Sequence, residues 1–259
     1  MSTLNKGKIN RVLQKAVPGT VLTMTWLAEQ GVSKDLARKY VASGWLKRIG
    51  RGAYVRTGDT VDWKGALFSL QTQLGMSVHV AAFSALQLKG LAHYLPMGNE
   101  NSIQLFSDGA ERLPTWFSET DWEIRVEHRG VRLFDGENNS LSEVEHKSFS
   151  IRVSSPERAA LEMLYCVKSN SDFDSAHEVF AGLGALRPNE IQTLLNACNS
   201  VRVKRTFLWM AKTCGHPWLK YIDLQNVDLG SGKRVVYQGG TLDREFLITV
   251  PKKKESADV

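Results

Sequence analysis

The stretch GVSKDLARKYVASGWLKRIGRGAYVR, residues 31–56, constrains the fold more than any other part of the chain. Ser33 stands where a helix N-cap is expected, immediately before KDLARKYVASG. Leu36 and Tyr40 recur at helical spacing and leave the charged residues on the other side. Gly44 is a natural helix terminator. The first half of the stretch therefore predicts a short amphipathic helix with a basic outer face.

The second half, WLKRIGRGAYVR, has the pattern of a β-hairpin. Two short strands are expected, over 45–49 and 53–56, joined by Gly50-Arg51-Gly52. Glycine adopts positive φ without steric cost, so the turn is expected to place Gly50 or Gly52 in that region. Arg51 would then stand at the tip of the hairpin.

Two further helices are expected upstream of this stretch. NKGKINRVLQKA, residues 5–16, carries apolar residues at helical spacing and is stopped by Pro18-Gly19. TMTWLAEQ, residues 23–30, begins on a potential Thr23 cap and ends before Gly31. Two short helices joined by a tight glycine turn and followed by a hairpin are typical of a winged helix-turn-helix, whose second helix enters the DNA major groove.

Charge is distributed unevenly along the chain, although the whole carries only +6. Residues 1–60 hold eleven Lys and Arg against three acids, a balance of +8. Residues 61–200 hold eleven bases against eighteen acids (−7), and residues 201–259 hold eleven against six (+5). A polyanion would be met mainly by the first sixty residues.

The expected DNA contacts follow from this arrangement. Base-edge contacts are expected from Lys34, Asp35 and Arg38, and phosphate positioning from Ser33 and Lys39. The preceding helix would contact the DNA backbone through Thr23 and Thr25. The wing would contact DNA through Arg48 and Arg51, with Arg51 either inserting into the DNA or contacting a phosphate. Winged helices also serve as protein-interaction modules, and basic clusters often only solvate a surface. The convergence of charge on one helix and its wing favours DNA.

The remaining chain indicates mixed α and β structure, so the fold class expected is α+β: an N-terminal winged helix-turn-helix followed by a larger mixed α/β C-terminal domain. Strands are expected in SIQLFS, DWEIRVEH, FSIRVS, RVVYQ and EFLITV, and helices after Asp62, within VHVAAFSALQLKGL, after Ser155 and over 172–182, 188–199 and 201–213. Gly58-Asp59 is the expected linker. The domains expected are 1–58 for DNA binding, 61–250 for the C-terminal domain and 251–259 for a flexible basic tail.

Residues 5–60 closely resemble the N-terminal winged helix of the AbiEi family, the antitoxins of bacterial type IV toxin-antitoxin systems associated with abortive phage infection. FSIRVSSPERAALEMLY, residues 149–165, resembles the family's C-terminal domain, where a strand runs through Ser-Pro-Glu-Arg into a helix. The resemblance implies a repressor that binds the operator of its own operon. It also implies neutralisation of a cognate nucleotidyltransferase-like toxin without a stable complex, and leaves open cooperative self-association on DNA.

The size of the C-terminal region implies a second task, which by resemblance is antitoxicity. Its expected location is a basic surface formed by Arg202, Lys204, Arg205 and Lys212, which helical spacing partly aligns. These residues alternatively solvate a helix or extend the DNA footprint. Two other functions stay open: chemical modification of the toxin or a nucleotide by an enzymatic C-terminal domain, and direct toxin sequestration.

Other motifs give little support for catalysis or cofactors. LGSGKR at 229–234 lacks the spacing of a phosphate-binding loop and is expected to be a hairpin turn. Cys166, Cys198 and Cys214 have neither zinc-site nor disulfide-framework spacing. No catalytic constellation is recognisable, so a non-enzymatic protein without metal or cofactor is expected. No membrane span or signal peptide is apparent, and a cytoplasmic location is expected.

Overall fold

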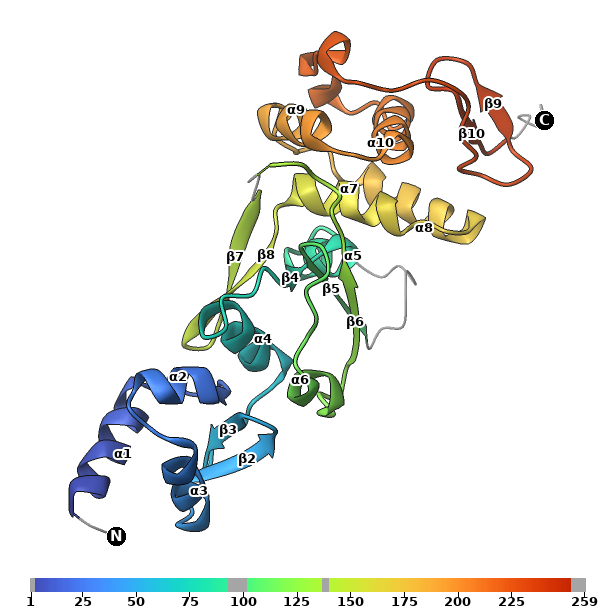
Figure 1. Cartoon of the computed structure of the whole chain (residues 1–259). Coiled ribbons are helices and arrows are strands. Elements are labelled where there is room, and N and C mark those ends of the chain that lie inside the picture. Colours follow the sequence, from blue (N-terminus) through green and yellow to red (C-terminus); the bar gives the residue numbers. More distant parts are fainter. Residues whose placement is uncertain (1–2, 93–101, 137–139, 253–259) are drawn as a thin grey trace. The chain divides into compact units, whose positions relative to one another are not determined.

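The structure is a computed structural model that describes residues 3–92, 102–136 and 140–252. The last seven residues of the expected basic tail lie outside these ranges. The chain forms two compact units (Figure 1). Unit 1 comprises Met1–Val80, Asn101–Val131 and Glu143–Val153, and unit 2 comprises Ala81–Glu100, Arg132–Ser142 and Ser154–Val259.

Unit 1 begins with the expected winged helix-turn-helix. Its elements are α1 (Thr3–Lys15), β1 (Leu22–Thr23), α2 (Met24–Glu29), α3 (Lys34–Ala42), β2 (Leu46–Gly50) and β3 (Ala53–Arg56). Side chains from all three helices, including Ile9, Leu27 and Tyr40, bury one common core with Leu46 of the wing. The predicted helices and hairpin are confirmed. Strand β1, which pairs antiparallel with β3, was not predicted because its two residues carry no periodic signal.

A mixed five-stranded sheet follows, in the order β6-β5-β4-β8-β7. The elements here are α4 (Trp63–Thr72), β4 (His79–Val80), β5 (Ser102–Ser107), α6 (Thr115–Glu119), β6 (Arg125–Gly130), β7 (Leu141–His146) and β8 (Phe149–Ser154). Strand β5 is parallel to β6 and antiparallel to β4, which is parallel to β8. The predicted strands over SIQLFS and FSIRVS are confirmed, as is the Asp62 cap of α4. Strand β7 and the short α6 were not predicted.

Helix α4 is hydrogen-bonded directly to the winged helix. The Ser69 hydroxyl donates to the Val21 carbonyl (2.6 Å), and the Gln73 amide donates to the same oxygen (2.7 Å). Gln73 Oε1 also accepts from the Thr23 backbone N–H (2.8 Å). The expected Gly58-Asp59 linker lies inside unit 1, and the Asp59 carboxylate accepts from the Gly19 N–H (3.1 Å). The division at residues 58–61 stays a prediction about independent folding.

Unit 2 is organised around helix α7. Its elements are α5 (Ala82–Leu88), α7 (Pro156–Cys166), α8 (Asn170–Ala181), α9 (Pro188–Ala197), α10 (Val201–Thr213), the short 3-10 helices η1 (Pro217–Tyr221) and η2 (Leu224–Asn226), and the hairpin β9 (Thr241–Asp243) and β10 (Ile248–Val250). Helix α7 packs against α5, α8, α9 and α10. Ser155 caps it and Pro156 occupies its first turn, as predicted. The strand predicted over RVVYQ is wrong: only Arg234 forms an isolated bridge, to Ile248.

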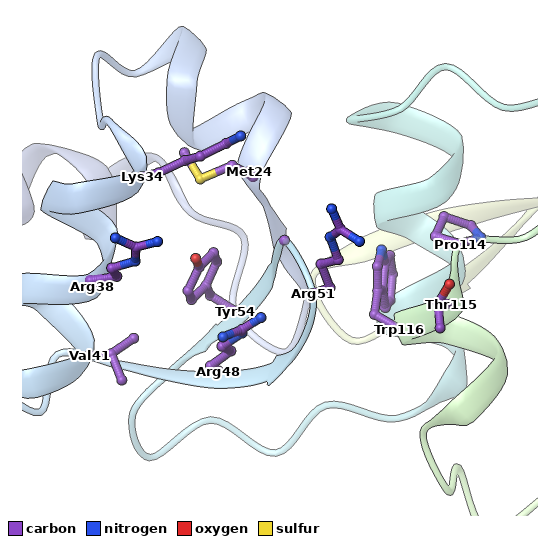
Figure 2. A pocket seen from close by; sticks show the side chains of 11 residues that line it. Met24, Lys34, Arg38, Val41, Arg48, Arg51, Tyr54, Pro114, Thr115 and Trp116 are labelled. Carbon is purple, nitrogen blue, oxygen red and sulfur yellow. The ribbon is translucent and has the colours of Figure 1, made fainter.

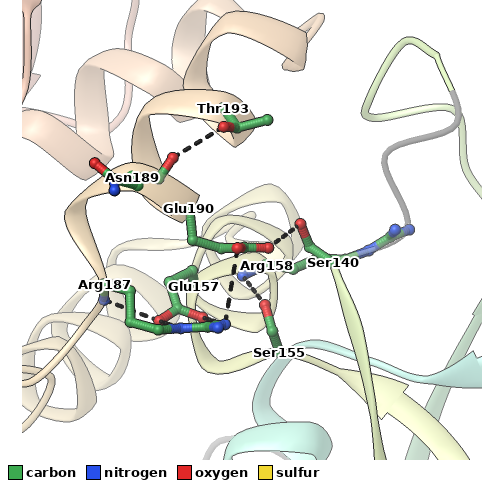
Figure 3. A network of polar contacts seen from close by, with 8 residues as sticks. All are labelled: Ser140, Ser155, Glu157, Arg158, Arg187, Asn189, Glu190 and Thr193. Carbon is green, nitrogen blue, oxygen red and sulfur yellow. Dashed lines mark hydrogen bonds and ion pairs between the residues drawn. The ribbon is translucent and has the colours of Figure 1, made fainter.

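A buried carboxylate ties the start of α7 to the start of α9 (Figure 3). Glu157 accepts hydrogen bonds from the Arg187 backbone N–H (2.9 Å) and from its guanidinium Nε and Nη2 (both 3.0 Å). Nearby, the Ser140 hydroxyl donates to Glu190 (2.5 Å). The three bonds from Arg187 satisfy the Glu157 carboxylate, which would otherwise be costly to bury.

We expect the Glu157–Arg187 contact to make stability fall in acid. Burial by itself raises the pKa of Glu157, but the hydrogen bonds and the charge of Arg187 outweigh it, so the pKa lies below its ordinary value of 4.5. The contribution is therefore present above pH 4.5 and is lost as the pH falls through the lower folded-state value. Urea unfolding between neutral pH and pH 3 should show this loss, and Arg187→Ala should reduce it. An unchanged pH dependence in that variant would contradict the assignment.

Candidate nucleic-acid interface

Helix α3 presents a basic face because its cap and its apolar residues fix its orientation. The Ser33 hydroxyl accepts from the Leu36 N–H (3.2 Å) and starts the helix. Ala37 and Tyr40 are buried, while the charged residues expected to contact DNA, Lys34, Asp35, Arg38 and Lys39, are exposed.

Arg38 is paired on the surface but remains accessible. Its Nη1 lies 3.0 Å from Asp35 Oδ1, one helical turn away, and the side chains are 79% and 81% exposed. An ion pair this exposed contributes about 0–1 kcal/mol. Arg38 can therefore exchange Asp35 for a phosphate or a base edge at little cost.

The basic face of α3 borders a hollow of about 730 Å³. Figure 2 shows Lys34, Arg38 and Val41 of α3 on one side, with Arg48 and Arg51 of the wing beside them. The full lining is Met24, Lys34, Arg38, Val41, Arg48, Arg51, Gly52, Tyr54, Pro114, Thr115 and Trp116. Four of these residues are cationic and none is acidic. The hollow therefore has a concentrated positive charge and no acidic residue in its lining, and the two aromatic lining residues, Tyr54 and Trp116, are themselves buried.

Gly50 and Gly52 of the wing are each required to be glycine, but for different structural reasons. Gly52 has φ +77°, which confirms the expected left-handed residue in the turn. Gly50 does not have positive φ; instead, a Cβ added there would lie 2.6 Å from the Cβ of Trp116. Trp116 is only 5% exposed, and α6 packs closely on the wing at Gly50, next to the turn. Arg48 Nε donates to the Gly50 carbonyl (3.0 Å).

The structure brings together four of the predicted contacts, Lys34, Arg38, Arg48 and Arg51, around the hollow. Ser33 and Thr25 are exposed at the beginnings of their helices. Thr23 does not fit its expected role and is corrected: it is 2% exposed, and its hydroxyl accepts from the Trp26 N–H (3.2 Å) as the cap of α2. Pro114–Trp116 were not predicted at this site, because nothing local in the loop before α6 indicates its proximity to the wing.

The predicted basic surface on α10 is also corrected. Lys204 and Arg205 are 5% and 2% exposed. The guanidinium of Arg205 donates to carbonyl oxygens of Leu229 (2.8 Å) and Gly230 (3.0 Å). Arg202 donates to the carbonyls of Tyr165 (3.1 Å) and Val167 (3.0 Å), and Lys212 pairs with Glu245. Two of the four residues are therefore buried and the other two are engaged within unit 2, so the four do not form an open basic patch.

The hairpin turn predicted at LGSGKR is wrong, because RVVYQ after it is not a strand; the loop instead binds Arg205. Its carbonyl oxygens, including that of Gly232 (2.5 Å), accept from Arg205, whereas a phosphate-binding loop directs amide N–H groups at its ligand. Over the described residues, no group of three or more His, Cys, Asp or Glu could hold a metal ion.

Two models of one protein family match this chain, one in each half. The family model described as "Transcriptional regulator, AbiEi antitoxin N-terminal domain" matches residues 5–97, and that described as "Transcriptional regulator, AbiEi antitoxin, Type IV TA system" matches residues 100–251. The chain belongs to the AbiEi antitoxin family. This family is one of transcriptional regulators, consistent with a protein that is not an enzyme.

A solved structure shares the fold of this AbiEi antitoxin. The crystal structure of the RV2827C protein from Mycobacterium tuberculosis aligns with a TM-score of 0.58 over 96% of this chain and 91% of that chain, at 14% identity. A search of curated proteins found no match. Within the described ranges, none of the helices has the length and apolar character needed to cross a bilayer.

Proposed function

We propose that this AbiEi antitoxin is a transcriptional autorepressor that binds double-stranded operator DNA of its own operon and also neutralises a cognate nucleotidyltransferase-like toxin. The observation that supports DNA binding is the convergence of Lys34, Arg38, Arg48 and Arg51 around one hollow without an acidic lining residue. A recognition helix beside a basic wing is the arrangement used by winged-helix proteins that read the major groove. Antitoxicity rests on the family membership, and the absence of a stable toxin complex is what the resemblance described above implies.

Arg38 and Lys39 should differ in the kind of DNA contact they make. If Arg38 reads a base, Arg38→Ala should cost about 1–3 kcal/mol at the operator and much less on unrelated DNA. Lys39→Ala should instead weaken binding to all sequences and reduce the salt slope by about one. Titrations of operator and unrelated duplexes at several salt concentrations measure both effects. Equal losses on both duplexes for Arg38→Ala would contradict base reading.

Repression and antitoxicity should separate in the full-length chain. Combined replacement of Lys34, Arg38 and Arg51 by alanine removes three exposed cations around the hollow, so operator binding and repression should be lost. Growth of cells that express the toxin should still be rescued, because α3 and the wing are not expected to carry antitoxicity. Reporter activity and growth are measured with the variant produced at wild-type levels. Cell death at those levels would place antitoxicity on the same surface.

A further inference from the structure

Helix α6 lies outside the helix-turn-helix and its wing, yet it completes the hollow beside the recognition helix. Pro114, Thr115 and Trp116 form one wall, with the residues of α3 and the wing around the rest (Figure 2). Unit 1 holds all eleven lining residues, so this wall belongs to the same compact body as α3.

Two neighbouring residues of α6 do different things there. Trp116 is buried, and its Cβ approaches Gly50 so closely that no side chain fits between them. Thr115 is exposed and is also one of the residues that line the hollow. Trp116 therefore packs against the wing, and Thr115 is the exposed polar residue of α6 at the hollow.

The lining favours a DNA strand as the occupant. Four cations border an open hollow, and in the described chain neither Lys34 nor Arg51 has a carboxylate partner. A duplex held by α3 and the wing would bring sugar-phosphate backbone beside these cations. Hydroxyl side chains are regular donors to DNA phosphates.

Resting on the proposed DNA binding, we propose that α6 is a third element of the DNA interface. Thr115 contacts the sugar-phosphate backbone of the strand held between α3 and the wing. Trp116 is a positioning residue that keeps Arg51 in place by packing on Gly50. The DNA-binding body is then unit 1, which extends beyond residue 58 to include the sheet that carries α6.

The test of Thr115 introduces a negative charge in the hollow of the full-length protein. Thr115→Asp should weaken binding to the operator duplex about tenfold or more at low salt and less at high salt. An acid at the start of α6 is favourable for the helix, so folding should be preserved. Ser118→Asp is the matched control: it adds the same charge to the same helix, but Ser118 lines a separate hollow with Arg112 and His128. It should change affinity less than about threefold.

The test of Trp116 uses its coupling to Arg51. If Trp116 positions Arg51, then Arg51→Ala should weaken operator binding several-fold in the wild-type background and have little effect in a Trp116→Ala background, with thermal unfolding confirming that each variant is folded. Additive losses would show that Trp116 has only a general structural role and would overturn its assignment.

The outcomes distinguish this inference from the function on which it rests. Failure of the wild-type protein to bind its operator would overturn both. In a second outcome, the wild-type protein binds its operator, replacing Lys34 and Arg38 abolishes the binding, and Thr115→Asp and Ser118→Asp have equal effects. This outcome would support DNA binding and overturn the role of Thr115.

Discussion

Replacement of Glu162 by alanine should lower the free energy of unfolding of unit 2 by about 3–5 kcal/mol. Glu162 is fully buried in α7. Its carboxylate accepts from the Ala82 N–H (3.0 Å), the Ser154 hydroxyl (2.6 Å) and Arg158 Nε (2.7 Å). The alanine variant removes the acceptor from all three donors and leaves the buried guanidinium without this counter-charge. The cost is therefore that of breaking a buried ion pair from one side.

Glu162 also holds an unusual backbone conformation. Ala82, the first residue of α5, has φ +52°, a left-handed conformation that costs a residue with a side chain on the order of 1 kcal/mol or more. The hydrogen bond from its N–H to Glu162 helps to keep it there. The Glu162→Ala variant should therefore loosen the contact between α5 and α7 as well as weaken the core.

Glu190→Ala is the control for this prediction. Glu190 is half-buried, and its carboxylate lies 4.0 Å from Arg187, whose side chain is largely exposed. Its removal should cost about 1 kcal/mol. Urea unfolding of the two full-length variants, monitored by a probe in unit 2, measures both losses of stability. Equal destabilisation by both substitutions would show that the Glu162 network is no stronger than the contacts of the half-buried Glu190 with Ser140 and Arg187.

The winged helix could be predicted from sequence because its signals are local. The Thr23 and Ser33 caps, the glycine turn and the alternating hairpin residues each act within a few positions of the element they define. The same locality explains why the start of α7 at Ser155-Pro156 was predicted. Strand β1 was missed because its pairing with β3 depends on contacts about thirty residues apart.

Residues of the candidate site could be predicted only where the exposure of a side chain follows from the spacing of nearby apolar residues. The cations of α3 face outward because Ala37 and Tyr40 face inward, and helical periodicity reveals this. On α10 helical spacing does not reveal exposure, because carbonyl groups more than twenty residues away accept from Arg205 and make its burial possible. Trp116 approaches Gly50 only in the folded unit, and neither residue indicates the other in sequence. Long-range contacts therefore decide which basic residues remain available to a partner.

Gly65→Ala is expected to destabilise unit 1 although the residue lies within a helix. Alanine in place of glycine in a helix normally stabilises by about 0.5–1 kcal/mol. In α4, however, a Cβ on Gly65 would lie 1.9 Å from the backbone carbonyl oxygen of Gly19, which cannot turn away like the end of a side chain. The helix and the segment before β1 must move apart, which should cost about 1–3 kcal/mol or more.

The movement should also reach the bonds that join α4 to the winged helix, because Ser69 lies one turn after Gly65 and donates to Val21. Operator binding should therefore weaken together with stability. The matched control is Gly7→Ala in α1, where nothing lies within 4 Å of the added Cβ and the usual helical gain is expected. Thermal unfolding and operator titration of both variants test this. A gain of stability in Gly65→Ala equal to that in Gly7→Ala would show that the winged helix does not pack on α4 in this way, and would favour the independent N-terminal domain expected from the sequence.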